Sequence, residues 1–345
     1  MEKIRVFTAF SGYDSQCLSL DRLKKKYPDF DYELVGWAEI DKYAIQAHNA
    51  IYPQWADRNY GDISKINWDE VPDFDLFTYS FPCTDISIVG NKQGFVEGSG
   101  THSSLLWECR RAIVEKKPKV LLMENVPNLI SMVNITLFNK WQEELSKYGY
   151  INYPQLLDAQ NFGIPQSRER LFVLSVRESI WYNSPQSIKL KHRLCDILQD
   201  CVEDKYYLSD SSISLLLSHA QLINRTSQLT DKVICLTVKK NGSQPRLQYR
   251  VYDSHGISPC LNCCQGGNLQ PKVLMPDGRI RKLTPRECFR LMDVDENVID
   301  IIQAAGISNS QQYKLAGNSI VVACLEKIFE QMFFPQYTNS RTLFG

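Results

Sequence analysis

The first half of the chain alternates short apolar runs with longer amphipathic stretches, and no other feature constrains the fold as strongly. Apolar runs of strand length occupy residues 4–9, 33–38, 75–80, 119–124 and 170–176. Between them the apolar spacing predicts helices at about 41–51, 105–116 and 135–148, and Asp41 is suited to cap the first. Since parallel strands need crossover connections of this kind, the pattern predicts a doubly wound α/β fold with a parallel sheet.

The sequence changes character after about Val176. Short mixed segments rich in Ser, Asn, Gly and Pro continue to about residue 280 and predict an irregular, mostly β domain inserted into the first. From "LTPRECFRLM" the periodicity is helical again, and "GNSIVVACLEKIFEQMF" predicts a helix that starts at its glycine. We therefore expect one domain at 1–185, an inserted domain at 186–280, and a hinge and C-terminal helix at 281–345 that return to the first domain.

Cysteine usage and hydropathy bound the class of protein. No stretch reaches the roughly 18 apolar residues that a membrane span requires, and "MEKIRVFTAFSG" lacks the apolar core of a secretory signal. The 11 cysteines form no disulfide framework, so we expect a cytoplasmic protein with no membrane partner. The nearest approach to a metal pattern is Cys260, Cys263 and Cys264 downstream of His255, and a single C-x-x-C predicts no metal site.

The formal net charge of zero hides an asymmetry along the chain. Residues 181–291 carry 16 Lys plus Arg against 9 Asp plus Glu, while the rest of the chain carries 23 against 30. A basic segment of this kind is the expected footprint of a partner with a phosphate backbone. A solvated basic surface without a partner is the alternative.

Three polar positions follow the ends of successive predicted strands. Ligands of doubly wound sheets bind there, where a tight first turn lets the backbone approach. "FTAFSGYDS" places Ser11 and Gly12 in that turn, without the full G-x-G-x-x-G. Glu39 stands where an acid binds ribose hydroxyls, and Asp62 stands where a carboxylate can accept from an adenine amino group. Each acid alone is compatible with a helix cap or a surface charge, but together they favour a nucleotide-like cofactor.

Cys83 follows a proline in "SFPCTDISIVG", directly after the apolar run "DLFTY". A free cysteine usually packs as a small hydrophobe, so a buried spare thiol is the alternative to a catalytic nucleophile. The other motifs of the chain have to decide between the two.

A series of short motifs occurs in the order found in one known family. They are "FTAFSG", Glu39-Ile40-Asp41, "GDI", "FPC", "SSLLWE", "MENV", "QSRER", "LTPREC" and "GNS". Over nearly its whole length the chain thereby resembles the C5-cytosine-specific DNA methyltransferases of bacterial or phage type. The resemblance implies a Rossmann-like, S-adenosylmethionine-dependent methyltransferase domain with an inserted target-recognition domain.

The resemblance also implies a reaction. The enzyme would transfer a methyl group from S-adenosylmethionine to C5 of a cytosine flipped out of a specific duplex sequence. Cys83 would add its thiolate to C6 and so make C5 nucleophilic. Glu124 would hydrogen-bond N3 and N4 of the ring, Arg168 would contact O2 and hold the thiolate, and Arg170 would brace the site.

By the same resemblance, a larger set of residues would surround the cofactor. The reaction would leave S-adenosylhomocysteine as its product and would need no metal. The set comprises Phe7 against the adenosyl group, Ser11, Gly12, Glu39, Ile40, Asp62, Ile63, Pro82, Leu105, Asn318 at the methionine carboxylate, and Ser319. Asn125 and Val126 would shape the loop around the cytosine. Arg286 and Glu287 would organise the hinge to the inserted domain.

The partner that the resemblance implies is double-stranded DNA. We expect a monomeric enzyme that lies at the nucleoid when it is bound to DNA. Whether a cognate restriction endonuclease accompanies it stays open. Residues 87–100, with four glycines, resemble the family's mobile loop that closes over the base. In the insert, Arg246 and Arg250 are candidates for reading bases, and Lys239 and Lys240 for contacting phosphates.

Some positions depart from the family pattern. Thr84, Asp85, His102 and Ser80 stand where glutamine, a small residue, arginine and glycine are usual, which affects the expected loop contacts to DNA. An RNA-directed relative is one alternative, but it would carry a Cys-Phe-Thr triplet in the insert, which this chain lacks. A silent DNA-binding pseudoenzyme is the other, and the intact motifs speak against it.

Overall fold

The computed structural model describes residues 2–82, 105–177, 182–224, 228–264 and 266–335. They form two compact units. Unit 1 comprises Met1–Leu157, Glu169–Gln186 and Cys324–Gly345, and unit 2 comprises Asp158–Arg168 and Ser187–Ala323. Each unit is therefore assembled from segments that are far apart in the sequence.

Unit 1 is built on a six-stranded sheet with the order β2-β1-β3-β4-β6-β5. The strands are β1 (Ile4–Ala9), β2 (Tyr32–Ala38), β3 (Leu76–Tyr79), β4 (Val120–Asn125), β5 (Ile151–Asp158) and β6 (Glu169–Val176). The first four pair in parallel, which confirms the α/β fold and these predicted strands.

The expectation of an all-parallel sheet is wrong for β6, which pairs with β4 in antiparallel orientation. The reason is β5, a strand that the sequence did not predict. Only residues 159–168 separate β5 from β6, and they are too few for a crossover helix. The chain therefore turns back, and the result is a mixed sheet.

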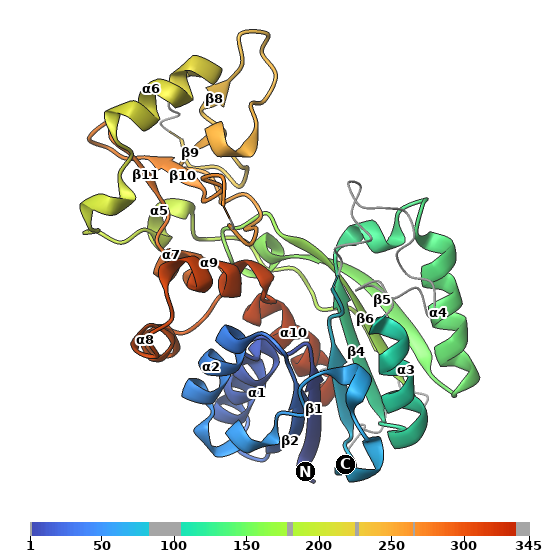
Figure 1. Ribbon diagram of the computed structural model, residues 1–345. Coiled ribbons are helices and arrows are strands. Elements are labelled where there is room, and N and C mark those ends of the chain that lie inside the picture. The colour runs from blue at the N-terminus through green and yellow to red at the C-terminus, as the bar shows by residue number, and fades with distance from the viewer. Residues whose placement is uncertain (1, 83–104, 178–181, 225–227, 265, 336–345) are drawn as a thin grey trace. The chain divides into compact units, whose positions relative to one another are not determined.

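In the described residues, four α-helices and most of α10 belong to unit 1. They are α1 (Ser15–Lys26), α2 (Lys42–Ile51), α3 (Leu105–Lys116), α4 (Ile135–Lys147) and α10 (Val322–Phe333). Figure 1 shows α1 and α2 on one side of the sheet and α3 and α4 on the other, as a doubly wound fold requires. The three predicted helices are confirmed, and Asp41 caps α2 by accepting from the amides of Tyr43 and Ala44. The prediction missed α1.

Unit 2 contains short elements joined by long irregular segments. Its helices are α5 (Leu194–Ile197), α6 (Asp210–His219), α7 (Pro285–Arg290), α8 (Glu296–Ala304) and α9 (Asn309–Asn318), and its strands are β7 (Gln221–Leu222), β8 (Thr237–Val238), β9 (Val251–Asp253), β10 (Lys272–Leu274) and β11 (Ile280–Lys282). β11, β10 and β9 form one small sheet, and β7 pairs with β8. The insert is irregular, as predicted, but its longest element is the unpredicted helix α6.

The expected helix from Gly317 onward is wrong at its start. Gly317 lies inside α9, and Ser319 adopts an extended conformation that ends this helix before α10 begins. A Cβ atom on Gly317 would lie 2.2 Å from the carbonyl oxygen of Asn262, so the glycine is required by close packing and not by a helix start. None of the helices in the described ranges has the length and apolarity that a membrane crossing requires.

Candidate active site

The turn after β1 brings Ser11 and Gly12 to the end of β2. Phe10, Gly12 and Asp14 all have positive φ angles, of 56°, 60° and 70°. The Phe10 amide donates to the carbonyl of Ala38, the last residue of β2. Such a turn needs residues that tolerate left-handed backbone, and glycine does so without a steric cost. The backbone thus lies at the carboxyl edge of the sheet, where ligands of this fold class bind.

Glu39 fastens this turn to the neighbouring strand. Its Oε2 atom accepts from the Gly12 amide at 2.9 Å, and its Oε1 atom accepts from the amides of Ile40 and Asp41 at 2.8 Å each. A carboxylate offers about four lone-pair sites, so the three amides leave capacity for a further donor. Glu39 is therefore neither a helix cap nor a free surface charge.

Ser11 carries an unsatisfied hydroxyl at the same edge. The side chain is 5% exposed, and its Oγ atom has no hydrogen-bond partner among the described residues. A buried polar group without a partner costs about 1–3 kcal/mol. The hydroxyl therefore fits a site that a polar ligand group completes.

Asp62 begins a single 3-10 turn, Ile63–Lys65, and acts as its cap. Its Oδ1 atom accepts from the hydroxyl of Ser64 at 2.8 Å and from the Ser64 amide at 3.0 Å. The Ser64 hydrogen bonds and the charge of Lys65, 3.5 Å away, hold the pKa of the Asp62 carboxyl below its usual value. Ile63 is buried in the core, whereas Ile40 is 72% exposed and offers an apolar surface beside Glu39.

Phe7 does not reach the surface. It is fully buried, with its ring centroid 5.2 Å from that of Phe74 and 5.3 Å from that of Trp68. Its contribution is to the packing below the turn. Leu105, at the start of α3, packs against the same core and keeps part of its surface exposed. Pro82 is also partly exposed.

Cys83 lies outside the described residues, as do Thr84, Asp85, His102 and the segment 87–100. The chain leading to it is held by Asn125. The Asn125 amide donates from Nδ2 to the carbonyl of Phe81 at 3.1 Å, and its Oδ1 atom accepts from the Val126 amide at 2.9 Å. The asparagine of "MENV" thus fixes the backbone two residues before Cys83.

Glu124 and Arg170 form an ion pair at the end of β4. Arg170 Nε lies 3.4 Å from Glu124 Oε1, and the side chains of Arg170 and Glu124 are 16% and 13% exposed. The antiparallel register sets Glu124 opposite Phe172, so Arg170 is its diagonal neighbour on β6. The pair therefore follows directly from the reversed direction of β6.

Within the described residues, the Arg168 side chain donates hydrogen bonds to backbone carbonyls of unit 2. Its Nη1 atom donates to the carbonyl of Leu261 at 2.8 Å, and its Nη2 atom to those of Gly317 and Ser319 at 2.9 and 2.8 Å. Gln166 acts in the same way, since it accepts from the Leu261 amide and donates to the Leu291 carbonyl. These buried side chains join three segments of unit 2.

The "GNS" segment packs against the cysteine-rich stretch. Asn318 is exposed, and its Oδ1 atom accepts from the thiol of Cys263 at 2.7 Å. The Ser319 hydroxyl donates to the Ala316 carbonyl. Within the ranges that the structure describes, no group of three or more His, Cys, Asp or Glu side chains could hold a metal ion.

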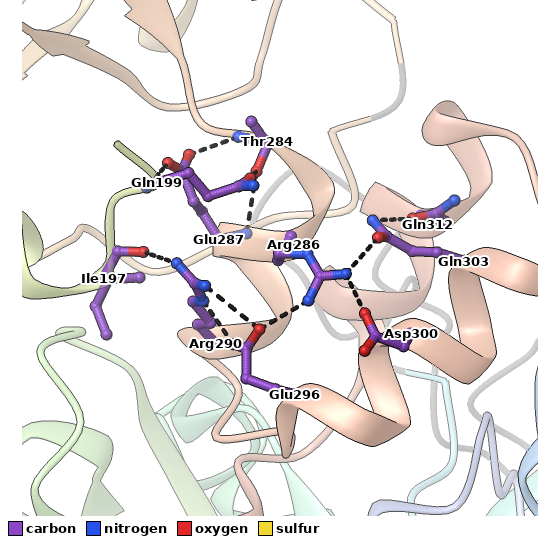
Figure 2. A network of polar contacts seen from close by, with 10 residues as sticks. All are labelled: Ile197, Gln199, Thr284, Arg286, Glu287, Arg290, Glu296, Asp300, Gln303 and Gln312. Atoms are coloured by element: carbon purple, nitrogen blue, oxygen red, sulfur yellow. Dashed lines mark hydrogen bonds and ion pairs between the residues drawn. The ribbon is translucent and has the colours of Figure 1, made fainter. Parts of the chain in front are cut away.

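A polar network around α7 and α8 contains Arg286 and Glu287 (Figure 2). Arg286 and Arg290 both donate to the carboxylate of Glu296, at 2.7 and 2.6 Å. Glu287 accepts from the amide of Gln199 at 2.8 Å and closes a capping box with Thr284. The network ties the start of the insert to α7, all within unit 2.

The basic residues predicted to meet DNA lie between β8 and β9. Lys239, Lys240 and Arg246 are exposed, and Arg250 is half-buried and donates to the Pro245 carbonyl. In the described part of the chain no carboxylate forms an ion pair with any of the four. Their charges are therefore available to an anionic partner.

Comparison with known proteins decides the family. A family model described as C-5 cytosine-specific DNA methylase matches residues 4–333. The chain belongs to this family. It is similar to the type II methyltransferase M2.ScrFI of Lactococcus lactis subsp. cremoris, with 33% identity over 96% of this chain and 100% of the relative. It is also similar to the type II methyltransferase M.HhaI of Haemophilus parahaemolyticus, with 31% identity over 86% of each.

Solved structures with the same fold have much lower identity. The Entamoeba histolytica methyltransferase EhMeth superposes with a TM-score of 0.75 at 16% identity, covering 98% of this chain and all of that one. The S. pombe Dnmt2 methyltransferase gives 0.72 at 18%, covering 96% and 99%. These likenesses confirm the Rossmann-like methyltransferase fold.

As a C-5 cytosine-specific DNA methylase, the protein is a DNA (cytosine-5-)-methyltransferase that acts on DNA, which confirms the resemblance seen in the sequence. Unit 1 brings Ser11, Gly12 and Glu39 together at one edge of the sheet. Sequence reasoning missed the tether from Asn125 to Phe81, because a contact to a backbone carbonyl leaves no sequence signal.

Proposed function

We propose that this enzyme transfers the methyl group of S-adenosylmethionine to C5 of a flipped-out cytosine in duplex DNA, through a covalent bond between Cys83 and C6. The observation that carries the proposal is the end of β4. There Glu124 lies nearly buried beside Arg170, and Asn125 holds the chain that leads to Cys83. Asn125 of "ENV" is thereby joined to Phe81, the residue before the "PC" motif.

The chemistry needs both motifs. Cytosine C5 is a poor nucleophile, and addition of the Cys83 thiolate to C6 pushes electron density onto N3 and C5. Glu124 hydrogen-bonds N3 and N4, which stabilises that charge. S-adenosylmethionine supplies an electrophilic methyl group when bound. After transfer, which leaves S-adenosylhomocysteine, a solvent water takes the proton from C5. The electrons of the C5–H bond re-form the double bond between C5 and C6, and the bond between C6 and the Cys83 sulfur breaks to return the thiolate.

The contacts of the two arginines favour a different division of roles from the one expected. Arg170, next to Glu124, is the better candidate to meet cytosine O2. Arg168 donates four hydrogen bonds within unit 2, to three carbonyls and the Cys260 sulfur, and acts as an organiser there.

The cofactor set is supported at the edge of the sheet in unit 1. The free acceptor capacity of Glu39 suits a ribose hydroxyl, and the buried hydroxyl of Ser11 suits a polar group of the amino-acid moiety. Asp62 is held in its ionised form, ready to accept from an adenine amino group. The resemblance assigns the remaining positions, which are Gly12, Ile40, Ile63, Pro82, Leu105, Asn318 and Ser319; Phe7 acts through packing alone.

Thiol replacement tests the function. The parent enzyme, Cys83→Ser and the control Cys201→Ser, which changes an exposed cysteine of unit 2, are incubated with labelled S-adenosylmethionine and mixed duplex DNA. We expect label in C5 of cytosine for the parent and the control, and none for Cys83→Ser despite retained DNA binding. Duplexes with 5-fluorocytosine, which cannot release its C5 substituent, should trap the parent covalently. Label elsewhere, or Cys83→Ser turnover within about tenfold of the parent, would overturn the assignment.

A further inference from the structure

An exposed loop of unit 2 has an unusual backbone. Gly266, Gly267 and Asn268 have φ angles of 69°, 59° and 56°, so three consecutive residues are left-handed. All three are exposed. Asparagine tolerates this conformation better than most residues, but not without cost. Something must therefore hold the loop in place.

Two lysines hold it. Lys272 of β10 and Lys282 of β11 lie directly opposite each other in the antiparallel register. Lys272 Nζ donates to the carbonyls of Asn268 and Gln270 at 2.7 and 3.3 Å, and Lys282 Nζ donates to Asn268 Oδ1 at 3.1 Å. Both the backbone and the side chain of Asn268 are fixed by ammonium groups.

This arrangement lowers the stability of the folded chain. Lys272 is 2% exposed, and no carboxylate in the described part of the chain pairs with it. Burial, with the nearby charge of Lys282, lowers the pKa of Lys272 to about 8. Like charges facing each other across strands are destabilising, and so is a buried cation without a counter-ion. In return, the two ammonium groups hold Asn268 in a fixed geometry.

The fixed geometry presents hydrogen-bond donors only. Because Lys282 occupies Oδ1 of Asn268, the amide orientation is set, and Nδ2 keeps two N–H groups without a partner among the described residues. The Lys282 ammonium keeps two further N–H groups. The major-groove edge of guanine presents two acceptors, N7 and O6, and adenine, thymine and cytosine do not present such a pair.

We propose that Asn268 and Lys282 read a guanine in the recognition sequence by donating to its major-groove edge, and that Lys272 is a positioning residue for Asn268. This rests on the proposed function, in that the substrate is duplex DNA. A phosphate would also accept hydrogen bonds from these donors. A phosphate contact, however, does not require a side-chain amide whose backbone carbonyl and Oδ1 atom are both held by lysines. The rigid setting therefore favours base reading.

The test uses the full chain and a duplex library randomised around cytosine, with relative kcat/KM for each sequence read from bisulfite sequencing. Asn268→Gly suits the left-handed backbone and removes only the side chain. Lys282→Met removes the second donor and frees the amide. Lys205→Met, at an exposed lysine paired with Glu203, is the control. Circular dichroism confirms folding of each variant.

We expect the parent to require guanine at one position, and Asn268→Gly and Lys282→Met to lose about 5- to 150-fold of that discrimination, the range for one bidentate base contact. Asn268→Asp, which replaces donors by an acceptor, should lose it too. Unchanged discrimination in an active Asn268→Gly variant overturns the proposal. Equal weakening for all sequences with a flatter salt dependence indicates a phosphate site and also overturns it. A parent without cytosine methylation would overturn the proposed function itself.

Discussion

The backbone amide of Gly12 donates a 2.9 Å hydrogen bond to the carboxylate of Glu39, a residue 27 positions further along the chain. This bond joins the turn after β1 to the end of β2. Glu39 therefore holds this turn in place, in addition to the acceptor role toward the cofactor that we propose for it. If Glu39 contacted only the cofactor, its removal would leave the turn after β1 unchanged.

Removal of the Glu39 carboxylate should therefore affect both binding and the turn. We expect Glu39→Ala to weaken S-adenosylmethionine binding by about tenfold or more, since hydrogen bonds to a charged group are worth about 1.5–3 kcal/mol. DNA affinity should change less. Calorimetric titration measures both, and hydrogen exchange at Gly12 should quicken. Asp29→Ala, at an exposed carboxylate, is the control. Unchanged cofactor affinity would remove Glu39 from the site.

The sequence predicts the position of Glu39 but not its bond to Gly12. Strand ends follow from hydrophobic periodicity, whereas the bond depends on the φ angles of a turn. β5 was missed because it lies at the edge of the sheet, carries Pro154 and alternates poorly. α1 was missed because buried Ser15, Gln16 and Ser19 conceal its apolar face.

The different contacts of the two arginines also could not be predicted from the sequence. Arg168 and Arg170 are identical in chemistry and two positions apart. Only Arg170 lies within β6, whose direction sets it beside Glu124. Because the sequence did not predict β5, it could not predict that direction. A resemblance transfers motifs faithfully, but it does not say which side chain of a motif faces the substrate.

Asn125 should act on catalysis through the chain before Cys83. In Asn125→Ala the Phe81 carbonyl loses its donor, and we expect kcat to fall about tenfold while KM for DNA changes little, because the nucleophile is misplaced and not the DNA surface. The rate of trapping by 5-fluorocytosine DNA reports this directly. Asn152→Ala removes a similar amide-to-carbonyl bond away from the site and serves as control. Equal losses in both variants would indicate a general stability effect.

Glu330 of α10 should make the stability of unit 1 depend on pH in the acid range. Burial favours its neutral form, but hydrogen bonds from Lys26, Lys327 and Tyr27 prevail and lower the pKa of Glu330 to about 2. A depressed carboxyl pKa contributes stability that is complete above its unfolded value of about 4.3 and is lost as pH falls toward 2. We expect Glu330→Gln to cost about 2 kcal/mol at pH 7. Urea unfolding at pH 7, 4 and 3 measures it, and a cost independent of pH would contradict the prediction.

The exposed cations between β8 and β9 should set the salt dependence of DNA binding. Each neutralised phosphate releases roughly 0.9 counterion, so Lys239→Ala with Lys240→Ala should weaken binding to all sequences alike and lower the slope of log affinity against log salt by up to about 2. Lys147→Ala with Lys205→Ala removes two exposed lysines elsewhere. A slope that the first pair leaves unchanged would mean that this basic surface is merely solvated.

Lys272 should lower the free energy of unfolding, while its ammonium group holds the backbone of Asn268. Its pKa of about 8 in the folded chain is below the unfolded value of about 10.4, so between these values the unfolded chain binds more protons and stability rises with pH. The groups that face Lys272 are Lys282, which lowers its pKa, and Cys264, whose own pKa is raised to about 12 by burial.

Lys272→Met should therefore be more stable than the parent at pH 7, by about 1–3 kcal/mol, because it removes a buried charge and keeps the volume. The difference should shrink as pH rises from 8 to 9.5, where the parent sheds the penalty. Urea unfolding at pH 7, 8 and 9.5 tests this, and subtraction of the two chains cancels the titration of other groups. The same variant should lose discrimination for guanine, because the Asn268 backbone is no longer held. A variant less stable than the parent at pH 7 would show that Lys272 is a net structural contributor, and that its burial reflects packing and not DNA reading.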